Sequence, residues 1–164
     1  MTTSAMVIVT NGYEDILLYR HCDGYPEGAG ENLKTFFGEA QFGYDTHLDD
    51  PEQVSHALIV WHARRGVRVE PACRTHGDIE YIYLVELPKG GRTVKIRGYK
   101  VRFKELSGLT AEQAKKRLLK RKPLVSYAVK CHDFTEPSVD VMWAGELKHV
   151  APAYYRELKE MLKE

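Results

Sequence analysis

The sequence predicts an α+β fold: an antiparallel sheet with a β-β-α-α-β-β core, helices on one face, and then a basic helix and a closing helix. Three observations predict it. Apolar strand-like segments flank an Asn-Gly pair near the start of the chain, and a similar pattern flanks a Pro-Lys-Gly-Gly turn near its middle. Between these two expected hairpins, apolar residues recur at helical spacing.

The first hairpin is expected over residues 6–21. Its strands flank Asn11-Gly12, a pair that suits a type I′ turn because both central positions need a positive φ. The pair Asp23-Gly24, followed by Tyr25 before a proline, ends the second strand. We expect residues 26–30, which are rich in glycine, to form a flexible loop.

Two helices are expected between the hairpins. The first has a buried stripe at helical spacing, formed by Leu33, Phe36, Phe37 and Ala40. For the second, Asp50 is the expected N-cap, Pro51 occupies the first helical position, and Gln53 reaches back as in a capping box. Gly66 is placed to end this helix, after two arginines that suit its negative C-terminal end.

The second hairpin begins with a strand over residues 78–87. One of its faces is expected to carry Ile79, Tyr81, Tyr83 and Val85, and the other Ile82 and Leu84. A strand that is apolar on both faces belongs inside a sheet. Residues 92–97 return as its antiparallel partner.

The last third of the chain is less regular. Thr110 and Gln113 have the spacing of a capping box, which opens a helix that ends at Lys122, before a proline. Three further elements are expected: short strands over residues 125–130 and 139–143, and a closing helix over residues 152–162.

Length and composition indicate one soluble domain over residues 1–164, with a division into a core (1–104) and an extension (105–164) as the alternative. Hydrophobic residues make up 43% of the chain, and no apolar run approaches the roughly 20 residues of a membrane helix. The first residues lack the pattern of a signal peptide, so we expect a cytoplasmic protein. Three cysteines without a Cys-x-x-Cys pair argue against a disulfide framework.

Charge is strongly segregated along the chain, although the net charge is only +1. Residues 92–122 contain twelve Lys or Arg and two Glu, whereas the first fifty residues contain nine acidic and two basic side chains. Such a distribution steers encounters with charged partners.

The basic segment supplies candidate binding residues: Lys95 and Arg97 on one strand face, and Lys116, Arg117, Lys120 and Arg121 on the helix. Tyr99 and Phe103 interleave with the bases, as in proteins that bind single-stranded nucleic acid. A solvated face is the simpler alternative, and no helix-turn-helix, zinc-finger, RRM or OB pattern is found. An acidic protein surface and a nucleic acid therefore both remain expected partners.

Residues 19–26, which read YRHCDGYP, form the most distinctive motif. His21 and Asp23 alternate around one residue, so an extended chain projects both to the same side. Such a pair could serve as a general base with its orienting carboxylate, or as two metal ligands. Tyr19, Arg20 and Tyr25 are further candidates for binding, the tyrosines as phenol or stacking groups.

A structural interpretation of the same motif stays open. Asp23 would hydrogen-bond its own turn, Gly24 would supply an unusual φ, Tyr25 would pack and Pro26 would fix the exit. The glycine-rich loop that follows precedes a helix, where backbone N–H groups can bind phosphate. No Lys-Ser or Lys-Thr pair follows, and two glutamates there would repel an anion, so the loop is not a P-loop.

A second polar cluster occupies residues 73–78 (CRTHGD). Cys73-x-x-His76 is half of a zinc pattern and Cys131-His132 could supply the other half, but the spacing requires no zinc, and we expect neither metal nor cofactor. No nucleophile motif such as Gly-x-Ser-x-Gly is present. The best enzymatic candidate is a joint site formed by His21, Asp23, His76 and Asp78. This site requires the second strand to meet the start of the third.

The motif of residues 19–26 resembles an element of small bacterial, prophage and phage proteins, which carry Tyr-Arg-His-x-Asp-Gly-Tyr-Pro after an opening hairpin. Residues 76–81 (HGDIEY) are similar to a later strand of those proteins, and the resemblance covers roughly residues 5–100. It implies no activity or catalytic residue. It implies a mobile-element setting, in which small accessory proteins often block a host complex, such as a defence system, by binding alone.

We therefore expect a non-enzymatic protein that binds a host macromolecular complex through its basic segment. A metal- or His/Asp-dependent enzyme that acts on a phosphodiester or nucleotide is one alternative. A protein that binds nucleic acid directly is another.

Overall fold

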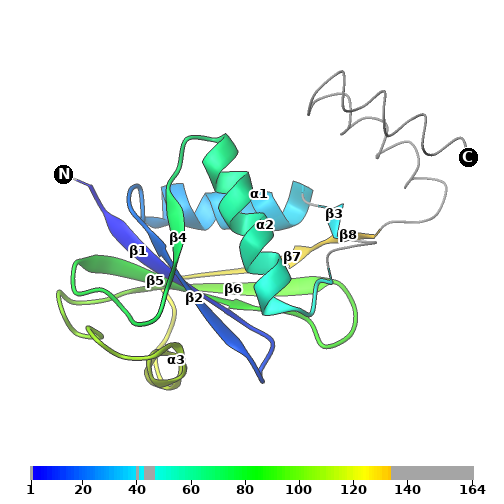
Figure 1. The fold of residues 1–164 in the computed structure, drawn as a ribbon. Coiled ribbons are helices and arrows are strands. Elements are labelled where there is room, and N and C mark those ends of the chain that lie inside the picture. Colours follow the sequence, from blue (N-terminus) through cyan, green and yellow to red (C-terminus); the bar gives the residue numbers. More distant parts are fainter. Residues whose placement is uncertain (1, 40, 43–46, 134–164) are drawn as a thin grey trace, which may run out of the picture. The chain divides into compact units, whose positions relative to one another are not determined.

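The structure, a computed structural model, describes residues 2–39, 41–42 and 47–133. A six-stranded mixed sheet forms its centre, with two helices on one face and a third helix on the other (Figure 1). The prediction of an α+β fold is confirmed. The prediction of a purely antiparallel sheet is wrong, because two of the strands pair in parallel.

The first hairpin forms, but its turn is not the predicted type I′ turn. β1 (Ser4–Thr10) pairs antiparallel with β2 (Asp15–Arg20), and Thr10 pairs with Asp15, so the loop contains four residues, 11–14. Gly12 has a φ of +93°, but Asn11 does not have the positive φ that a type I′ turn needs. Every residue of β1 is buried, because this strand lies inside the sheet and has helices over both of its faces.

The second hairpin joins β5 (Ile79–Glu86) to β6 (Thr93–Lys100), which runs further than the predicted strand over residues 92–97. β5 also pairs with β1, and this pair is parallel. A parallel pair needs a long crossover connection, which the two helices between the hairpins provide. The mixed sheet therefore follows from placing β1 beside β5.

One side chain of β5 lies on the face opposite to the predicted one. The alternation predicts Ile79 beside Tyr81, but Ile79 packs in the apolar cluster of the other face. The register between the strands shifts at this point, since Ser4 pairs with Ile79 and Ala5 with Tyr81. The extra residue on β5 forms a bulge, which breaks the alternation.

Two shorter strands complete the sheet, in the order β4-β2-β1-β5-β6-β7. β7 (Val125–Lys130) has the predicted bounds, whereas β4 (Val69–Ala72) was not predicted. β4 contains Pro71, a residue that weakens the strand pattern but is tolerated at the edge of a sheet.

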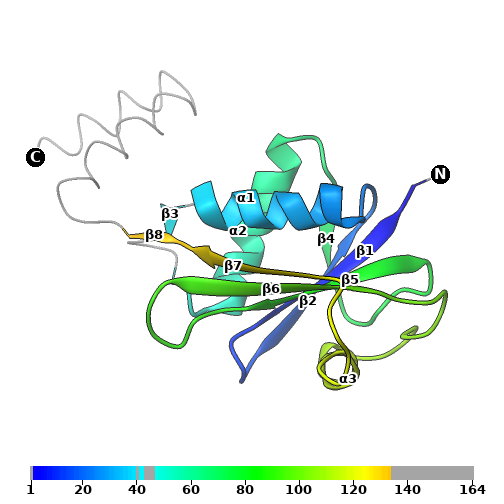
Figure 2. The same ribbon diagram turned by 180° about the vertical axis from the view of Figure 1, so that it is seen from behind.

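The crossover between the hairpins contains a π-helical turn and two helices. The turn η1 (Pro26–Gly30) buries Ala29 and Gly30 and leads directly into α1 (Glu31–Glu39), so the prediction of a flexible loop is wrong. Figure 2 shows α1 lying along β7, which it contacts.

α2 (Pro51–Arg64) has the predicted start. The Asp50 carboxylate accepts hydrogen bonds from the N–H groups of Glu52 and Gln53. The Gln53 side chain does not accept from the backbone N–H of Asp50, as a capping box would require. It accepts from the backbone N–H of His47 instead. Both helices bury their apolar sides on the sheet, in a cluster that includes Val7, Leu18, Leu33, Phe37, Leu58 and Tyr83.

α3 (Ala111–Leu118) covers the second face of the sheet. Thr110 and Gln113 form the predicted capping box. Ala114 and Leu118 are buried against the sheet, in a cluster with Met6, Ile8, Leu17, Tyr19, Leu84 and Tyr99. The helix ends at Leu118, so the prediction that it reaches Lys122 is wrong.

Contacts divide the chain into residues 1–132 and 133–164. β3 (Gln41–Phe42) and β8 (His132–Asp133) form a two-stranded sheet. The predicted strand over residues 139–143, the predicted helix over residues 152–162 and Ala40 lie outside the described residues. No helix in the described ranges is both long and apolar enough to cross a membrane.

Candidate functional site

The motif of residues 19–26 divides its side chains between the two faces of the sheet. Arg20 lies on the face covered by α1 and α2, with Leu18, whereas Tyr19 belongs to the cluster on the α3 face. This division follows from strand alternation, which also turns His21 toward Tyr19.

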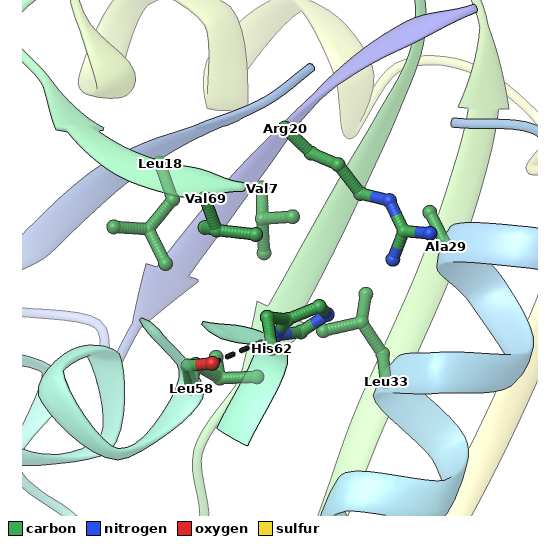
Figure 3. Close-up of a pocket in the computed structure, with 8 residues that line it drawn as sticks. All are labelled: Val7, Leu18, Arg20, Ala29, Leu33, Leu58, His62 and Val69. Atoms are coloured by element: carbon green, nitrogen blue, oxygen red, sulfur yellow. Dashed lines mark hydrogen bonds between the residues drawn. The ribbon is translucent and has the colours of Figure 1, made fainter. Parts of the chain in front are cut away.

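Arg20 is buried between the sheet and the helices, with 2% of its surface exposed. Its Nε donates to the carbonyl of Cys22 at 2.7 Å, and its Nη1 donates to Oδ1 of Asn32 at 2.8 Å. Figure 3 shows the guanidinium and the imidazole of His62 entering one pocket, a cavity of about 10 Å³. Arg20 therefore ties the turn after β2 to the start of α1, and its guanidinium is not on the surface.

His62 is the second polar group in this cavity. Its Nδ1 lies 2.7 Å from the carbonyl of Leu58, which can only accept, so Nδ1 carries the proton and Nε2 the lone pair. Burial lowers the pKa of His62 to about 4, and the nearby positive charges of Arg20 and Arg65 act in the same direction. His62 is therefore neutral at neutral pH.

Close backbone contacts fix the turn that follows β2. Asp23 adopts the positive φ, +51°, so the prediction that Gly24 supplies the unusual φ is wrong. Gly24 is needed for space, because a Cβ there would lie 2.8 Å from the Cβ of Ala5. The carbonyl of Gly24 accepts from the buried hydroxyl of Tyr83 at 2.7 Å, and its N–H donates to the carbonyl of Thr3 at 2.8 Å.

Asp23 makes a hydrogen bond within its own motif. Its carboxylate accepts from the hydroxyl of Tyr25 at 3.1 Å, and this bond raises the pKa of Tyr25. Tyr25 is 38% exposed, so the prediction that it packs is wrong. Pro26 begins η1, in line with its expected role at the exit of the turn.

Tyr19 is the centre of a polar cluster on the α3 face. Its hydroxyl donates to Oδ2 of Asp78 at 2.6 Å and lies 3.1 Å from Oγ of Ser4. The imidazole of His76 stacks on the phenol ring at a centroid distance of 4.0 Å, and that of His21 meets it edge-on at 4.4 Å. Burial, followed by the bond to Asp78, raises the pKa of Tyr19, so the phenol keeps its proton.

His21 is paired with a carboxylate from β4. Its Nε2 lies 3.1 Å from Oε1 of Glu70, and the side chains are 30% and 38% exposed. This contact lowers the pKa of Glu70, and Arg68, which lies 3.0 Å from its other oxygen, lowers it further. A carboxylate that orients an imidazole is the arrangement of a general base and its supporting group.

The predicted joint site is brought together in part. His21, His76 and Asp78 each contact Tyr19, whereas the Asp23 carboxylate bonds Tyr25. Sequence reasoning missed Glu70, because its position beside His21 depends on the pairing of β2 with the unpredicted strand β4. We call His21, Glu70, Tyr19, His76 and Asp78 the imidazole cluster.

Residues 101–124 form a basic layer on the same side of the sheet. They include α3 and the loop before it, and they contain eight Lys or Arg against two Glu. Lys95 and Arg97 face the same side, because they follow at intervals of two residues on the strand face that carries the buried Tyr99 of the α3 cluster. The structure therefore brings together the predicted basic residues of the strand and the helix on one face.

Several of these charges have acidic neighbours. Arg97 pairs with Glu86, Lys115 with Asp15, Lys116 with Glu112 and Arg121 with Glu105. Arg117, Lys120 and Lys122 pair with no carboxylate of the described residues. Tyr99 is 2% exposed and cannot stack on a base, whereas Phe103 is 71% exposed and has the ammonium of Lys104 5.3 Å from its ring centroid.

The imidazole cluster borders the basic layer. The backbone N–H of Lys104 donates to the carbonyl of Gly77 at 3.1 Å, directly after His76. Arg74 donates to the carbonyl of Gly108 at 2.9 Å, and Thr75 bonds the backbone of the same loop. The loop between β4 and β5, which carries His76 and Asp78, is thus fixed to the loop that carries Phe103.

The cysteines of the predicted zinc half-patterns differ in surroundings. Cys73 is exposed, and Cys131 is buried with a pKa raised to about 11 by desolvation. Within the part of the chain that the structure describes, no three His, Cys, Asp or Glu side chains are grouped so as to hold a metal ion.

Comparison of the chain with protein-family models, with curated proteins and with solved structures gave no match. The function is therefore argued from the geometry.

Proposed function

We propose that the protein acts by binding, and that its basic layer docks on a nucleic-acid strand, either free or held by a host complex. The observation that carries the proposal is the excess of eight Lys or Arg over two Glu within residues 101–124, which lie together on one side of the sheet. Most of nonspecific affinity for nucleic acid comes from such charges, which replace the counterions of the phosphates.

The composition of the layer favours phosphate over an acidic protein surface. Five of its eight basic residues are lysines, which are depleted from the cores of protein interfaces. Phe103 offers an exposed ring beside Lys104, and Tyr13, in the turn of the first hairpin, is 87% exposed with Lys89 at 4.9 Å from its ring centroid. An exposed aromatic ring beside a cation suits a base stacked on the ring and a phosphate at the ammonium.

Fluorescence anisotropy with labelled single-stranded RNA and DNA at several salt concentrations tests the proposal. The variant Arg117→Glu/Lys120→Glu reverses two charges of the basic layer. As a matched control, Lys34→Glu/Arg64→Glu reverses one charge of α1 and one of α2, the helices on the opposite face of the sheet. We expect the slope of log affinity against log salt to become shallower by at least about 1.4 in the first variant, because each single-strand phosphate contact contributes about 0.7. The control should keep the slope of the unmodified protein.

Equal slopes in the two variants would refute docking through the basic layer. Binding to an acidic polypeptide such as polyglutamate with an affinity above that for RNA and DNA would assign the layer to a protein partner instead.

The biological setting is a wider part of the proposal. The resemblance of residues 19–26 to small bacterial and phage proteins supports an accessory protein of a mobile element, which binds the nucleic acid held by a host defence complex. That role predicts that phage plate more efficiently on a defended host that produces this protein than on one that produces Arg117→Glu/Lys120→Glu. Equal plating on the two strains would contradict it.

A further inference from the structure

We propose that His21 and His76 form a general acid–base pair that cleaves single-stranded RNA by internal transesterification, at the edge of the basic layer. The proposal extends the proposed function, since the basic layer is the surface that would hold the strand. It depends on three observations: two imidazoles on one phenol ring, a carboxylate beside one of them, and a basic loop fixed to the other.

The two imidazoles share one neighbour, the phenol ring of Tyr19. Both contact the Tyr19 ring, with centroid distances of 4.4 Å and 4.0 Å, from opposite ends of the chain segment that separates β2 from β5. Tyr19 is held in turn by the bond from its hydroxyl to Asp78. The His21 side chain is 30% exposed and His76 is partly exposed, so both rings are accessible from solvent.

The neighbours of each ring assign the roles. Oε1 of Glu70 lies 3.1 Å from Nε2 of His21, and Arg68 lies 3.0 Å from the other oxygen of that carboxylate. The negative charge beside Nε2 favours a proton there, which leaves Nδ1 as the lone-pair nitrogen of a neutral ring. His21 is therefore the general base. The face of a phenol ring attracts a cation, and Asp78 lies at the edge of the same ring, so the stacked His76 is the general acid.

The step requires no further reactant. His21 takes the proton of a ribose 2′-hydroxyl as its oxygen bonds to phosphorus, the bond from phosphorus to the 5′ oxygen breaks, and His76 protonates the leaving oxygen. The products are a 2′,3′-cyclic phosphate and a 5′-hydroxyl, and the two imidazoles exchange protons with water before the next turnover. DNA lacks the attacking hydroxyl and is not a substrate.

The test is cleavage of a labelled single-stranded RNA in the presence of EDTA, with a DNA of the same sequence as the negative control. His21→Gln and His76→Gln should each lower the rate by at least about 100-fold, the usual contribution of general acid–base catalysis. His56→Gln, which changes an exposed histidine of α2, is the matched control and should retain the rate. The cleavage rate of the unmodified protein should first rise and then fall as the pH increases. His21→Gln should lose one of these two changes and His76→Gln the other.

A structural role for the cluster would give a different result. Glu70→Gln keeps both imidazoles and should lower the rate while circular dichroism shows an unchanged melting transition. Absence of RNA cleavage by the unmodified protein would overturn the proposal, as would cleavage that persists in both His21→Gln and His76→Gln or that EDTA abolishes.

A dinucleoside phosphate distinguishes this proposal from the proposed function. Such a substrate is too short to depend on the basic layer. Its cleavage by a protein that fails to bind longer RNA would support the acid–base pair and contradict the docking surface. Binding of RNA without cleavage of either substrate would support the docking surface and contradict the acid–base pair.

Discussion

Acidification should destabilise the protein through the buried imidazole of His62. In the unfolded chain this histidine binds a proton below a pH of about 6.5, whereas in the folded protein its pKa is about 4. Between these two values the unfolded state binds more protons than the folded state, so the free energy of unfolding falls as the pH falls. Integrating between pH 7 and pH 4.5 gives a loss of about 2 kcal/mol from this one group.

Urea denaturation at pH 7 and at pH 4.5 measures this loss, if the protein is compared with two variants of the same helix. His62→Gln removes the buried titrating group, and His56→Gln removes an exposed one. Other groups, such as Glu70, titrate in all three proteins and cancel in the comparison. We expect His62→Gln to lose about 2 kcal/mol less than the other two between these pH values.

The reasoning would be refuted if all three proteins lost stability in parallel. That result would mean that the His62 cavity admits the charged form, despite its burial and the nearby guanidinium of Arg20. A higher stability of His62→Gln at both pH values would not matter to the test, because the pH dependence carries the argument.

Three further predictions concern the packing of the fold and use the same denaturation assay. Tyr83→Phe should cost about 1–2 kcal/mol, because it leaves the carbonyl of Gly24 without its buried donor, and an unchanged stability would contradict that bond. Gly24→Ala should cost about 1–3 kcal/mol, since its Cβ would lie 2.8 Å from a side chain of β1, whereas Gly90→Ala, which meets nothing within 4 Å, should be nearly neutral. A double-mutant cycle of Lys115→Met and Asp15→Asn should give a coupling of about 1 kcal/mol, because the pair is largely buried and its ammonium lies 2.8 Å and 3.0 Å from the two carboxylate oxygens; a coupling near zero would show that the pair is fully solvated.

Short sequence motifs predicted those features that depend on hydrogen bonds between residues close in sequence. Asp50 caps α2, and Thr110 with Gln113 caps α3, whereas Asn11-Gly12 marks the position of its turn but not the turn type. In each case the donor and the acceptor lie within a few residues of each other, so the residue types alone contain the information. The reciprocal bond predicted for Gln53 does not form, because His47 offers a competing backbone donor from the preceding loop.

The pairing of strands distant in sequence could not be read in the same way. β4 has four residues and a proline, and it becomes a strand only because β2 offers a free edge. The parallel pair of β1 and β5 leaves one trace, the uninterrupted apolar run of residues 5–9, which indicates burial on both faces but does not name the neighbour. The extra residue that moves Ile79 to the other face depends on this same pair.

The candidate site shows the same limit. The prediction that His21, His76 and Asp78 share a site required β2 to meet the start of β5, but β1 lies between these two strands. The residues come together because the long side chain of Tyr19 reaches Asp78. The sequence could not supply Glu70, whose contact with His21 needs β4. Nor could it separate Asp23 from the site, because the alternation that places Asp23 beside His21 stops where the chain leaves β2.

The motif of residues 19–26 serves architecture and surface chemistry at the same time, because neighbouring residues of a strand face opposite sides of the sheet. Arg20 points into the core, where it donates hydrogen bonds to Cys22 and Asn32, while Tyr19 and His21 lie on the other face, in the imidazole cluster. The structural and the functional interpretations of this motif are therefore not exclusive. Loss of Arg20 removes two charge-assisted hydrogen bonds and affects folding, whereas a change at His21 alters a partly exposed ring, so substitutions at adjacent positions separate the two roles.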